Sequence, residues 1–156
     1  MPSIRIVSIG RDKDAWLTAG CEHYRKLLGR YARVEFAFLP VLKAAGSLSP
    51  DEIKTKEAAK LSPEIESGFV IALHDRGRSF ESQAFARELE KIESHARGTL
   101  TFAIGGPYGL HESILERADL VWSLSPLTFS HQLVRLVLLE QLYRAYSIRH
   151  GTSYHK

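Results

Sequence analysis

The chain has 156 residues, 44% hydrophobic and 25% charged, which is typical of one globular domain, so we expect a single domain over residues 1–156 without a flexible linker. Cys21 is the only cysteine, which excludes an internal disulfide and a cysteine-based zinc site. The sequence shows neither an apolar run of membrane-spanning length nor a secretory signal, so we expect a cytoplasmic protein with no membrane or metal partner. Lys and Arg outnumber Asp and Glu by 21 to 18, and the net charge of +3 is compatible with a nucleic-acid partner without demonstrating one.

Patterns that predict strands and patterns that predict helices alternate along the chain. Strands are expected where apolar residues alternate with polar ones or form short runs, and helices where apolar residues return every three or four positions. Ser49-Pro50-Asp51-Glu52 predicts a capping box at one helix, and Ser82 predicts the N-cap of the next. In chain order we expect a strand over 4–9, a helix over 14–28, a strand over 34–38, a loop over 42–48, a helix over 50–61, a strand over 69–73, a helix over 82–96, a strand over 100–104, a short helix over 112–117, a strand over 120–124 and a long helix over 130–148. This alternation predicts an α/β domain with a mostly parallel sheet and helices on both faces.

Three segments follow the carboxyl ends of predicted strands, after Leu73, Ile104 and Leu124. In an open parallel sheet these ends share one edge, and ligands bind there. The segment 105–109, Gly-Gly-Pro-Tyr-Gly, brings bare backbone to this edge, but it matches neither a dinucleotide fingerprint nor a Walker phosphate loop. Two interpretations of this segment stay open: a binding loop, or a tight turn that needs positive φ angles.

Hydroxyl groups, a proline and a histidine gather between Ser123 and His131, at the start of the last predicted helix. A hydrolase with Ser125 or Ser130 as nucleophile and His131 as base is disfavoured, because a GxSxG motif is missing and neighbouring residues rarely form such a pair. We expect Ser130 to be the helix N-cap and His131 to be a first-turn residue. The donors and acceptors of this segment are also suited to holding an adenine or a ribose.

The last predicted helix carries a wide apolar face, formed by Leu133, Val134, Val137, Leu138, Leu142 and Tyr143. This face predicts either packing against another subunit or burial in the core. The same quarter of the chain is rich in basic residues, which are most simply interpreted as solvated: Arg135, Arg144, Arg149, His150, His155 and Lys156. For Glu140, Arg144 and Arg149 on this helix, substrate contact and simple solvation both stay open. The ending Tyr154-His155-Lys156 combines an aromatic surface, an imidazole and a cation, which together suit RNA.

Three motifs in this chain resemble one known family. GGPYGL at 105–110, SLSPLTFSHQLVRLVLLEQLYRAYSIRHG at 123–151 and the terminal YHK are similar to the RlmH-type SPOUT methyltransferases. The resemblance covers essentially the whole chain, including the opening SIRIVSIG, and three spaced motifs are far more specific than one. Family members often have Pro-Tyr-His near the terminus, where this chain has Ser153-Tyr154-His155.

The resemblance implies an enzyme that uses S-adenosylmethionine to methylate N3 of a pseudouridine in a stem-loop of 23S ribosomal RNA, as a homodimer. It also implies a deep trefoil knot in the C-terminal part, which the order of elements alone would not predict. In the family the knot loops form the cofactor pocket, and the matching cofactor-binding residues here are Leu73, Gly105, Leu124, Ser125, Pro126, Leu127, Thr128 and Phe129.

The expected catalytic residues are Arg144, Tyr154 and His155. Arg144 and His155 are expected to orient the base and phosphates and to stabilise developing negative charge, while Tyr154 stacks on the base. Because the family is dimeric, one subunit's tail is expected to complete its partner's site.

Two alternative functions stay open. One is a SPOUT enzyme that methylates a ribose 2′-hydroxyl or a guanine, and the other is a non-catalytic ribosome-binding factor, which would not bind the cofactor. The whole-chain resemblance favours the pseudouridine. The modest net charge favours the assembled ribosome over naked RNA, because weak phosphate attraction must then be supplemented by shape.

Overall fold

The computed structural model describes residues 1–43 and 45–156 and contains each of the expected strands and helices. The strands are β1 (Ser3–Ile9), β2 (Arg33–Leu39), β3 (Phe69–Ser79), β4 (Leu100–Ile104) and β5 (Leu120–Ser123). The helices are α1 (Ala15–Leu28), α2 (Pro50–Leu61), α3 (Ser82–His95), α4 (Glu112–Arg117) and α5 (His131–Arg149), with short 3-10 helices η1 (Ala45–Ser47) and η2 (Ser62–Ile65). Of the loop expected over 42–48, residue 44 lies outside the described residues, and η1 occupies part of the rest.

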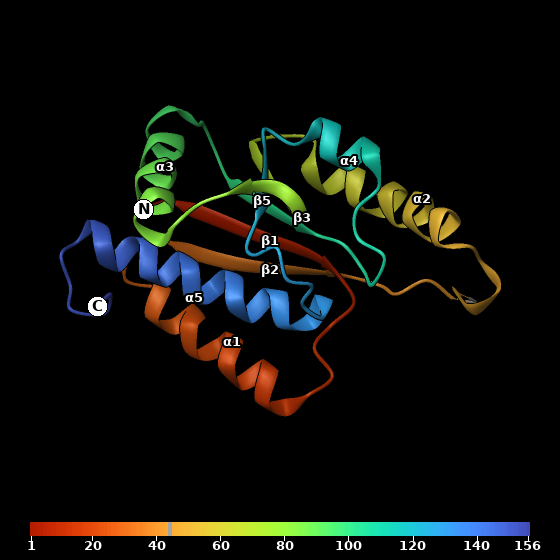
Figure 1. Cartoon of the computed structure of the whole chain (residues 1–156), viewed down its shortest axis with the longest axis horizontal. Helices are drawn as coiled ribbons and strands as arrows, with labels where there is room; N and C mark the ends of the chain where they lie inside the picture. The colour runs from red at the N-terminus through yellow and green to blue at the C-terminus, as the bar shows by residue number, and fades with distance from the viewer. Residues whose placement is uncertain (44) are drawn as a thin grey trace.

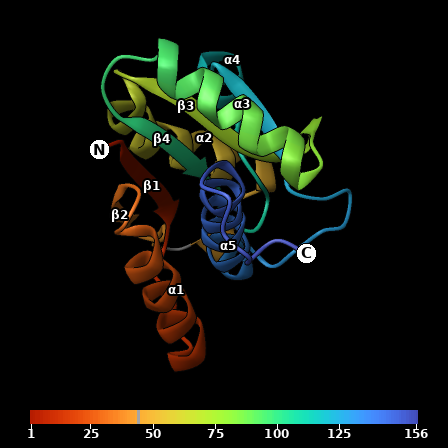
Figure 2. The ribbon, with the colours of Figure 1, turned by 90° about the vertical axis from the view of Figure 1, so that its left-hand side faces the viewer.

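All five strands pair in parallel, in the order β2-β1-β4-β3-β5 (Figure 1). Helices α1, α3 and α5 pack on one face of this sheet and α2 and α4 on the other, which confirms the predicted α/β architecture. Figure 2 shows α5 end-on, between α1 and α3. Within the part of the chain that the structure describes, no helix is long and apolar enough to cross a membrane. The trefoil knot stays a prediction.

Strand β3 continues to Ser79 and does not end at Leu73 as predicted. Leu73 and Arg78 both pair with Trp122 of β5, so the residues between them leave the regular ladder. Gly77 makes this possible, because a Cβ at that position would lie 2.7 Å from the carbonyl oxygen of Val121. The polar sequence after Leu73 has no apolar alternation, and the prediction therefore stopped too early.

The predicted helix starts are confirmed at two positions and wrong at a third. Ser49 opens α2 with a full capping box, and the Ser130 hydroxyl caps the first turn of α5. Ser82, however, is not the N-cap of α3. The last extended residue before α3 is Glu81, with φ −70° and ψ 155°, and the Ser82 hydroxyl instead donates to Gln141 Oε1 at 2.9 Å.

A buried cation fixes α5 to the first strand of the sheet. Arg135 is fully buried, contrary to the expectation that it is solvated. Its Nε donates to Asp12 Oδ1 at 2.9 Å, its Nη2 pairs with the same carboxylate, and its Nη1 donates to Ser8 Oγ and to the Gly10 carbonyl at 2.9 Å each. The beginning of α5 is therefore held in place by the segment that follows β1.

Candidate functional site

A cavity of about 230 Å³ opens at the carboxyl edge of the sheet, beside the first turn of α5. Its walls come from the irregular part of β3, from the end of β4 and the turn that follows it, from the segment after β5 and from α5 itself. Of the residues expected to bind the cofactor, Leu73, Leu124, Ser125, Leu127 and Phe129 line the cavity. The three segments that were singled out in the sequence thus meet at one cavity, although the first of them lies within β3 and not at its end.

The remaining three expected cofactor residues, Gly105, Pro126 and Thr128, are each adjacent in sequence to residues that line the cavity. Gly105 is buried, whereas Pro126 and Thr128 are exposed. The cavity wall therefore includes both sequence neighbours of each of these three residues.

The segment 105–109 is both a tight turn and a cavity wall. Gly109 has a φ of +84°, and its N–H donates to the Gly106 carbonyl at 3.0 Å, as the turn interpretation expects. The four residues from Gly106 to Gly109 also line the cavity. A Cβ on Gly105 would lie 2.7 Å from the carbonyl carbon of Gly109, so a side chain there would force the turn open.

His74 and Asp75, which were not expected at a site from the sequence, also line the cavity, as does His131 at the start of α5. His74 and Asp75 lie in the irregular part of β3, with 3.2 Å between His74 Nδ1 and Asp75 Oδ1. Burial lowers the pKa of His131, and the positive charge of Arg135 lowers it further, so the imidazole is neutral at neutral pH. Among the described residues, no group of three or more His, Cys, Asp or Glu is placed to hold a metal ion.

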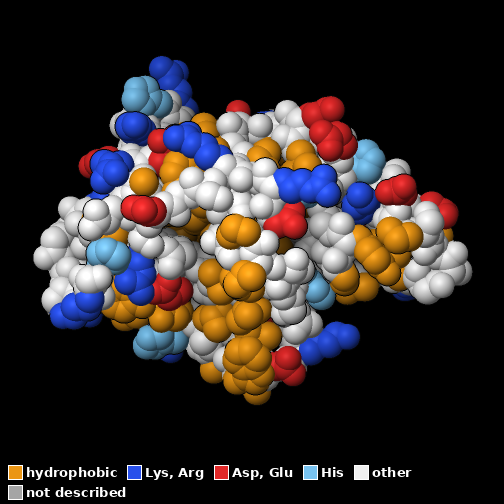
Figure 3. Space-filling model, viewed as in Figure 1, with side chains coloured by type: hydrophobic (Ala, Val, Ile, Leu, Met, Phe, Trp, Pro, Cys, Tyr) orange, Lys and Arg blue, Asp and Glu red, His pale blue; other side chains and the backbone are white. Residues whose placement is uncertain are grey.

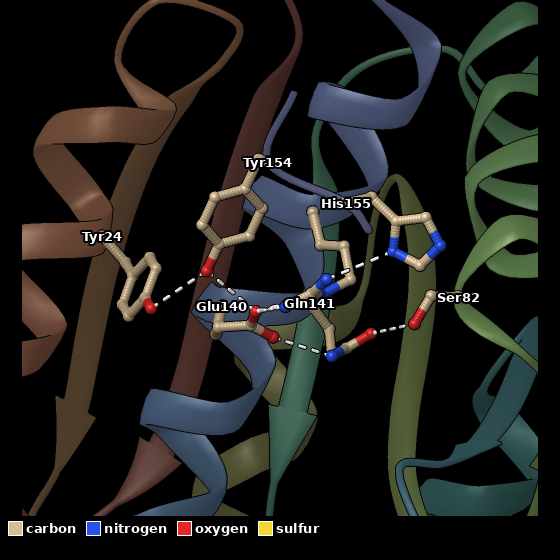
Figure 4. A network of polar contacts seen from close by, with 7 residues as sticks. Tyr24, Ser82, Glu140, Gln141, Tyr154 and His155 are labelled. Carbon is tan, nitrogen blue, oxygen red and sulfur yellow. Dashed lines mark hydrogen bonds and ion pairs between the residues drawn. The ribbon is translucent and has the colours of Figure 1, made fainter. Parts of the chain in front are cut away.

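A second cluster of polar side chains is centred on Glu140, in the middle of α5, and extends to the C-terminal tail (Figure 4). Glu140 Oε1 accepts hydrogen bonds from Arg144 Nη2 at 2.6 Å, from Arg144 Nε at 3.1 Å and from the Tyr154 hydroxyl at 2.9 Å. Arg144 Nη1 lies 3.2 Å from His155 Nδ1, and the guanidinium carbon of Arg144 lies 4.8 Å from the Tyr154 ring centre. The structure therefore brings the three expected catalytic residues together, and Glu140, for which substrate contact and solvation were both left open, connects Arg144 with Tyr154.

The protonation states in this Glu140 cluster follow from its contacts. Burial, followed by hydrogen bonds with Tyr24 at 3.1 Å and with Glu140, raises the pKa of Tyr154 far above its ordinary value, so the hydroxyl stays protonated. The hydrogen bond to Glu140 raises the pKa of Arg144, so its guanidinium stays charged. Gln141 Nε2 donates to Glu140 Oε2 at 2.7 Å, which connects the cluster to α3 through the Ser82 contact.

The cavity and the Glu140 cluster do not meet within one chain. Val134 lines the cavity, and Arg144 lies ten residues further along the same helix. At about 1.5 Å per residue, their backbones are about 15 Å apart along the helix axis. The expected cofactor residues and the expected catalytic residues are thus placed at opposite ends of α5.

The apolar face predicted for α5 is divided between two environments. Leu138 and Leu142 are fully buried in the core under the helix, and Tyr143 packs with its ring centre 4.7 Å from that of Tyr154. Leu133 and Val137 stay half-exposed. Burial in the core therefore accounts for only part of this face, and the rest faces outward.

Comparison with known proteins gives consistent matches over the whole chain. The model of a family described as predicted SPOUT methyltransferase matches residues 2–155. Proteins named ribosomal RNA large subunit methyltransferase H are similar to this chain. The protein from Limosilactobacillus reuteri (strain DSM 20016) is 40% identical to it, and the protein from Listeria monocytogenes serotype 4a (strain HCC23) is 41% identical. Both alignments span 158 residues and cover 99% of this chain and 99% of the relative. Among solved structures, a probable methylase family protein from Haemophilus influenzae Rd KW20 has a similar fold, with a TM-score of 0.57, 16% identity, and 98% of this chain and 70% of that chain covered.

Proposed function

Because the chain belongs to the SPOUT methyltransferase family, we propose that it uses S-adenosylmethionine to methylate N3 of a pseudouridine in a stem-loop of 23S ribosomal RNA. The observation that carries this proposal is the full-length similarity, at 40% identity, to a protein named ribosomal RNA large subunit methyltransferase H. We infer further that the 156 residues act as one domain, in the cytoplasm, on the assembled ribosome.

The cavity suits the cofactor that this proposal requires. S-adenosylmethionine has an adenosine part, which needs apolar walls and backbone hydrogen bonds, and a charged part, which needs polar groups. Leu73, Leu124 and Phe129 supply apolar walls, the turn at 105–109 supplies bare backbone, and Asp75 supplies a carboxylate at the edge. When bound, S-adenosylmethionine supplies an electrophilic methyl carbon. The cavity of about 230 Å³ is somewhat smaller than the ~300–1,000 Å³ of typical ligand sites, so part of the cofactor would stay uncovered by one chain.

The side chains of the Glu140 cluster suit the other half of the reaction. An imide N3–H is a weak acid, and stabilising the anion that its loss creates accelerates alkylation at that nitrogen. The Arg144 guanidinium is charged and is suited to stabilising this anion. Tyr154 stays protonated, and His155 Nδ1 faces an Arg144 N–H, so these two groups orient the base and are not arranged to accept its proton.

A second copy of the chain would unite the two halves of this site. Leu133, Val137, Glu140 and Arg144 follow one another at four- and three-residue spacing, so they share one face of α5. Figure 3 shows hydrophobic side chains gathered over α5 and the start of α1. Trp16, in the first turn of α1, is 62% exposed. A second α5 packed on this apolar face would bring its Arg144 toward the first chain's cavity, and the site would be shared across a homodimer.

The reaction is tested by incubating the purified protein with radiolabelled S-adenosylmethionine and with unmethylated ribosomes, separate subunits or naked 23S RNA. Mass spectrometry then locates the labelled nucleotide. Label at N3 of a pseudouridine supports the proposal, and label on a ribose or a guanine would replace it with a different SPOUT activity. Failure to bind the cofactor would leave a non-catalytic ribosome-binding factor as the better hypothesis.

The shared site is tested by mixing two inactive variants. Arg144→Ala removes the cation, and Gly105→Val blocks the turn, because a Cβ there meets the Gly109 backbone at 2.7 Å. If the site is shared, mixed dimers contain one intact site, and activity should recover to about a quarter of that of the wild type after subunit exchange. If each chain carries its own complete site, mixing should restore nothing.

A further inference from the structure

The turn at 105–109 is supported from behind by a buried carboxylate. Glu57, on α2, is only 5% exposed, and its Oε2 accepts the Gly106 N–H at 3.2 Å. Its two carboxylate oxygens would lie 2.7 and 2.9 Å from a Cβ on Gly106, so the carboxylate sits directly against this glycine. Glu57 thus contacts the turn from the side of α2.

The cavity lies on the other side of this turn. Helix α2 packs on the face of the sheet that it shares with α4, whereas the cavity is lined by His131 and Val134 of α5, which packs on the opposite face. In a trans peptide the N–H and the preceding carbonyl point in opposite directions. Because the Gly106 N–H points toward Glu57, the Gly105 carbonyl of the same peptide points away from Glu57, while Gly106 itself lines the cavity.

The packing of α2 does not by itself explain a carboxylate at this position. Ile53, Ala58 and Leu61 are the other buried residues of this helix, and all are apolar. Burial raises the pKa of Glu57, because removing the carboxylate from water disfavours its charged form. An apolar side chain of similar size would avoid that cost but would leave the Gly106 N–H without its acceptor.

We infer that Glu57 is a positioning residue for cofactor binding: it fixes the orientation of the Gly105–Gly106 peptide, so that the backbone of the turn is ready to receive S-adenosylmethionine. This inference rests on the proposed function. Glu57 does not line the cavity, so it acts through the turn and not by contact with the cofactor.

The test compares four proteins: the wild type, Glu57→Ala, Glu57→Gln and Thr55→Ala. Glu57→Gln keeps an oxygen that can accept the Gly106 N–H, and Thr55→Ala alters an exposed position of the same helix. Isothermal titration gives the Kd for S-adenosylmethionine, and hydrogen exchange of the Gly106 and Gly109 amides is measured in the cofactor-free proteins. We expect Glu57→Ala to weaken cofactor affinity about tenfold and to speed exchange in the turn, with Glu57→Gln and Thr55→Ala within about twofold of the wild type.

Steady-state kinetics separate positioning from a general structural effect. For Glu57→Ala we expect a raised KM for S-adenosylmethionine, with kcat at saturating cofactor and the KM for the ribosomal substrate unchanged. If Glu57→Ala does not fold, Glu57→Asp replaces it, because the shorter side chain keeps the charge but withdraws the acceptor from Gly106.

Three results would overturn the inference. If the wild type binds and methylates but Glu57→Ala binds equally well, Glu57 has no positioning role and the proposed function still stands. If Glu57→Gln is as impaired as Glu57→Ala, hydrogen-bond acceptance is not what Glu57 contributes. If the wild type itself does not bind S-adenosylmethionine, both the proposed function and the inference fall.

Discussion

Replacing Asp12 by Ala should destabilise the protein strongly, because it leaves the buried Arg135 cation without its counterion. The side chain of Arg135 is 0% exposed and that of Asp12 is 6% exposed, so water cannot readily take the place of the carboxylate. Of the three partners of the guanidinium, only Ser8 Oγ and the Gly10 carbonyl would remain. Removing one partner of a buried ion pair costs about 3–5 kcal/mol. For a chain of this length, each kcal/mol corresponds to roughly 2–4 °C, so the melting temperature should fall by roughly 6–20 °C.

Urea unfolding, followed by tryptophan fluorescence and by circular dichroism, measures this loss. Glu22→Ala is the matched control, because it removes the acid of an exposed ion pair with Arg25 and should leave the midpoint unchanged. The double variant Asp12→Ala with Arg135→Met should recover much of the stability, since an apolar side chain needs no counterion. A loss below about 1 kcal/mol for Asp12→Ala alone would refute this account of how α5 is held.

Three further outcomes are expected. Arg144→Ala should lower turnover about 100-fold with little change in S-adenosylmethionine affinity by titration, and an equal loss of both would contradict its assigned role. Burial, and then the negative charge of Asp12, raise the pKa of Cys21 to about 11. A thiol reagent at about pH 8 should therefore label Cys21 slowly until the protein unfolds. Rapid labelling of the folded protein would be inconsistent with this pKa. Burial raises the pKa of Glu57 above its ordinary value of 4.5. The contribution of Glu57 to the free energy of unfolding of the wild type is therefore fully present below about pH 4.5 and is lost as the pH rises through the folded-state pKa. Glutamine does not titrate, so in urea unfolding the stability of Glu57→Gln relative to the wild type should rise as the pH increases above about 4.5, and a constant difference would argue against the raised pKa.

The periodicity of apolar residues was sufficient to predict the elements of this fold. Each apolar run or alternation became a strand, and the capping signals at Ser49 and Ser130 marked true helix starts. Ser82 has the same chemistry but lies one residue inside α3, because its hydroxyl bonds to Gln141, 59 positions away. A local pattern cannot distinguish a serine that caps its own helix from a serine that bonds to another helix.

The candidate site was predictable where it depends on the ends of strands. Ile104 and Leu124 line one cavity because β4 and β5 end at the same edge, and Leu73 joins them from the point where β3 leaves its regular ladder. The contributions of Glu57, Glu140 and Arg135 were not predictable in the same way. Each is a charged residue on a helix, and its role comes from a partner that the fold brings to it, such as Gly106 for Glu57 or Asp12 for Arg135.

The contacts of Arg135 also constrain how the protein folds as it is synthesised. Arg135 bonds to Asp12 and Ser8, which were added to the chain 123 and 127 residues earlier. Strand β1 pairs with β4 as well as with β2, so even the centre of the sheet joins distant parts of the chain. Such long-range contacts favour slow folding, because the bonds between Arg135 and the segment after β1 can form only once α5 has been synthesised. The fold is therefore complete only after α5 has packed onto the segment that follows β1.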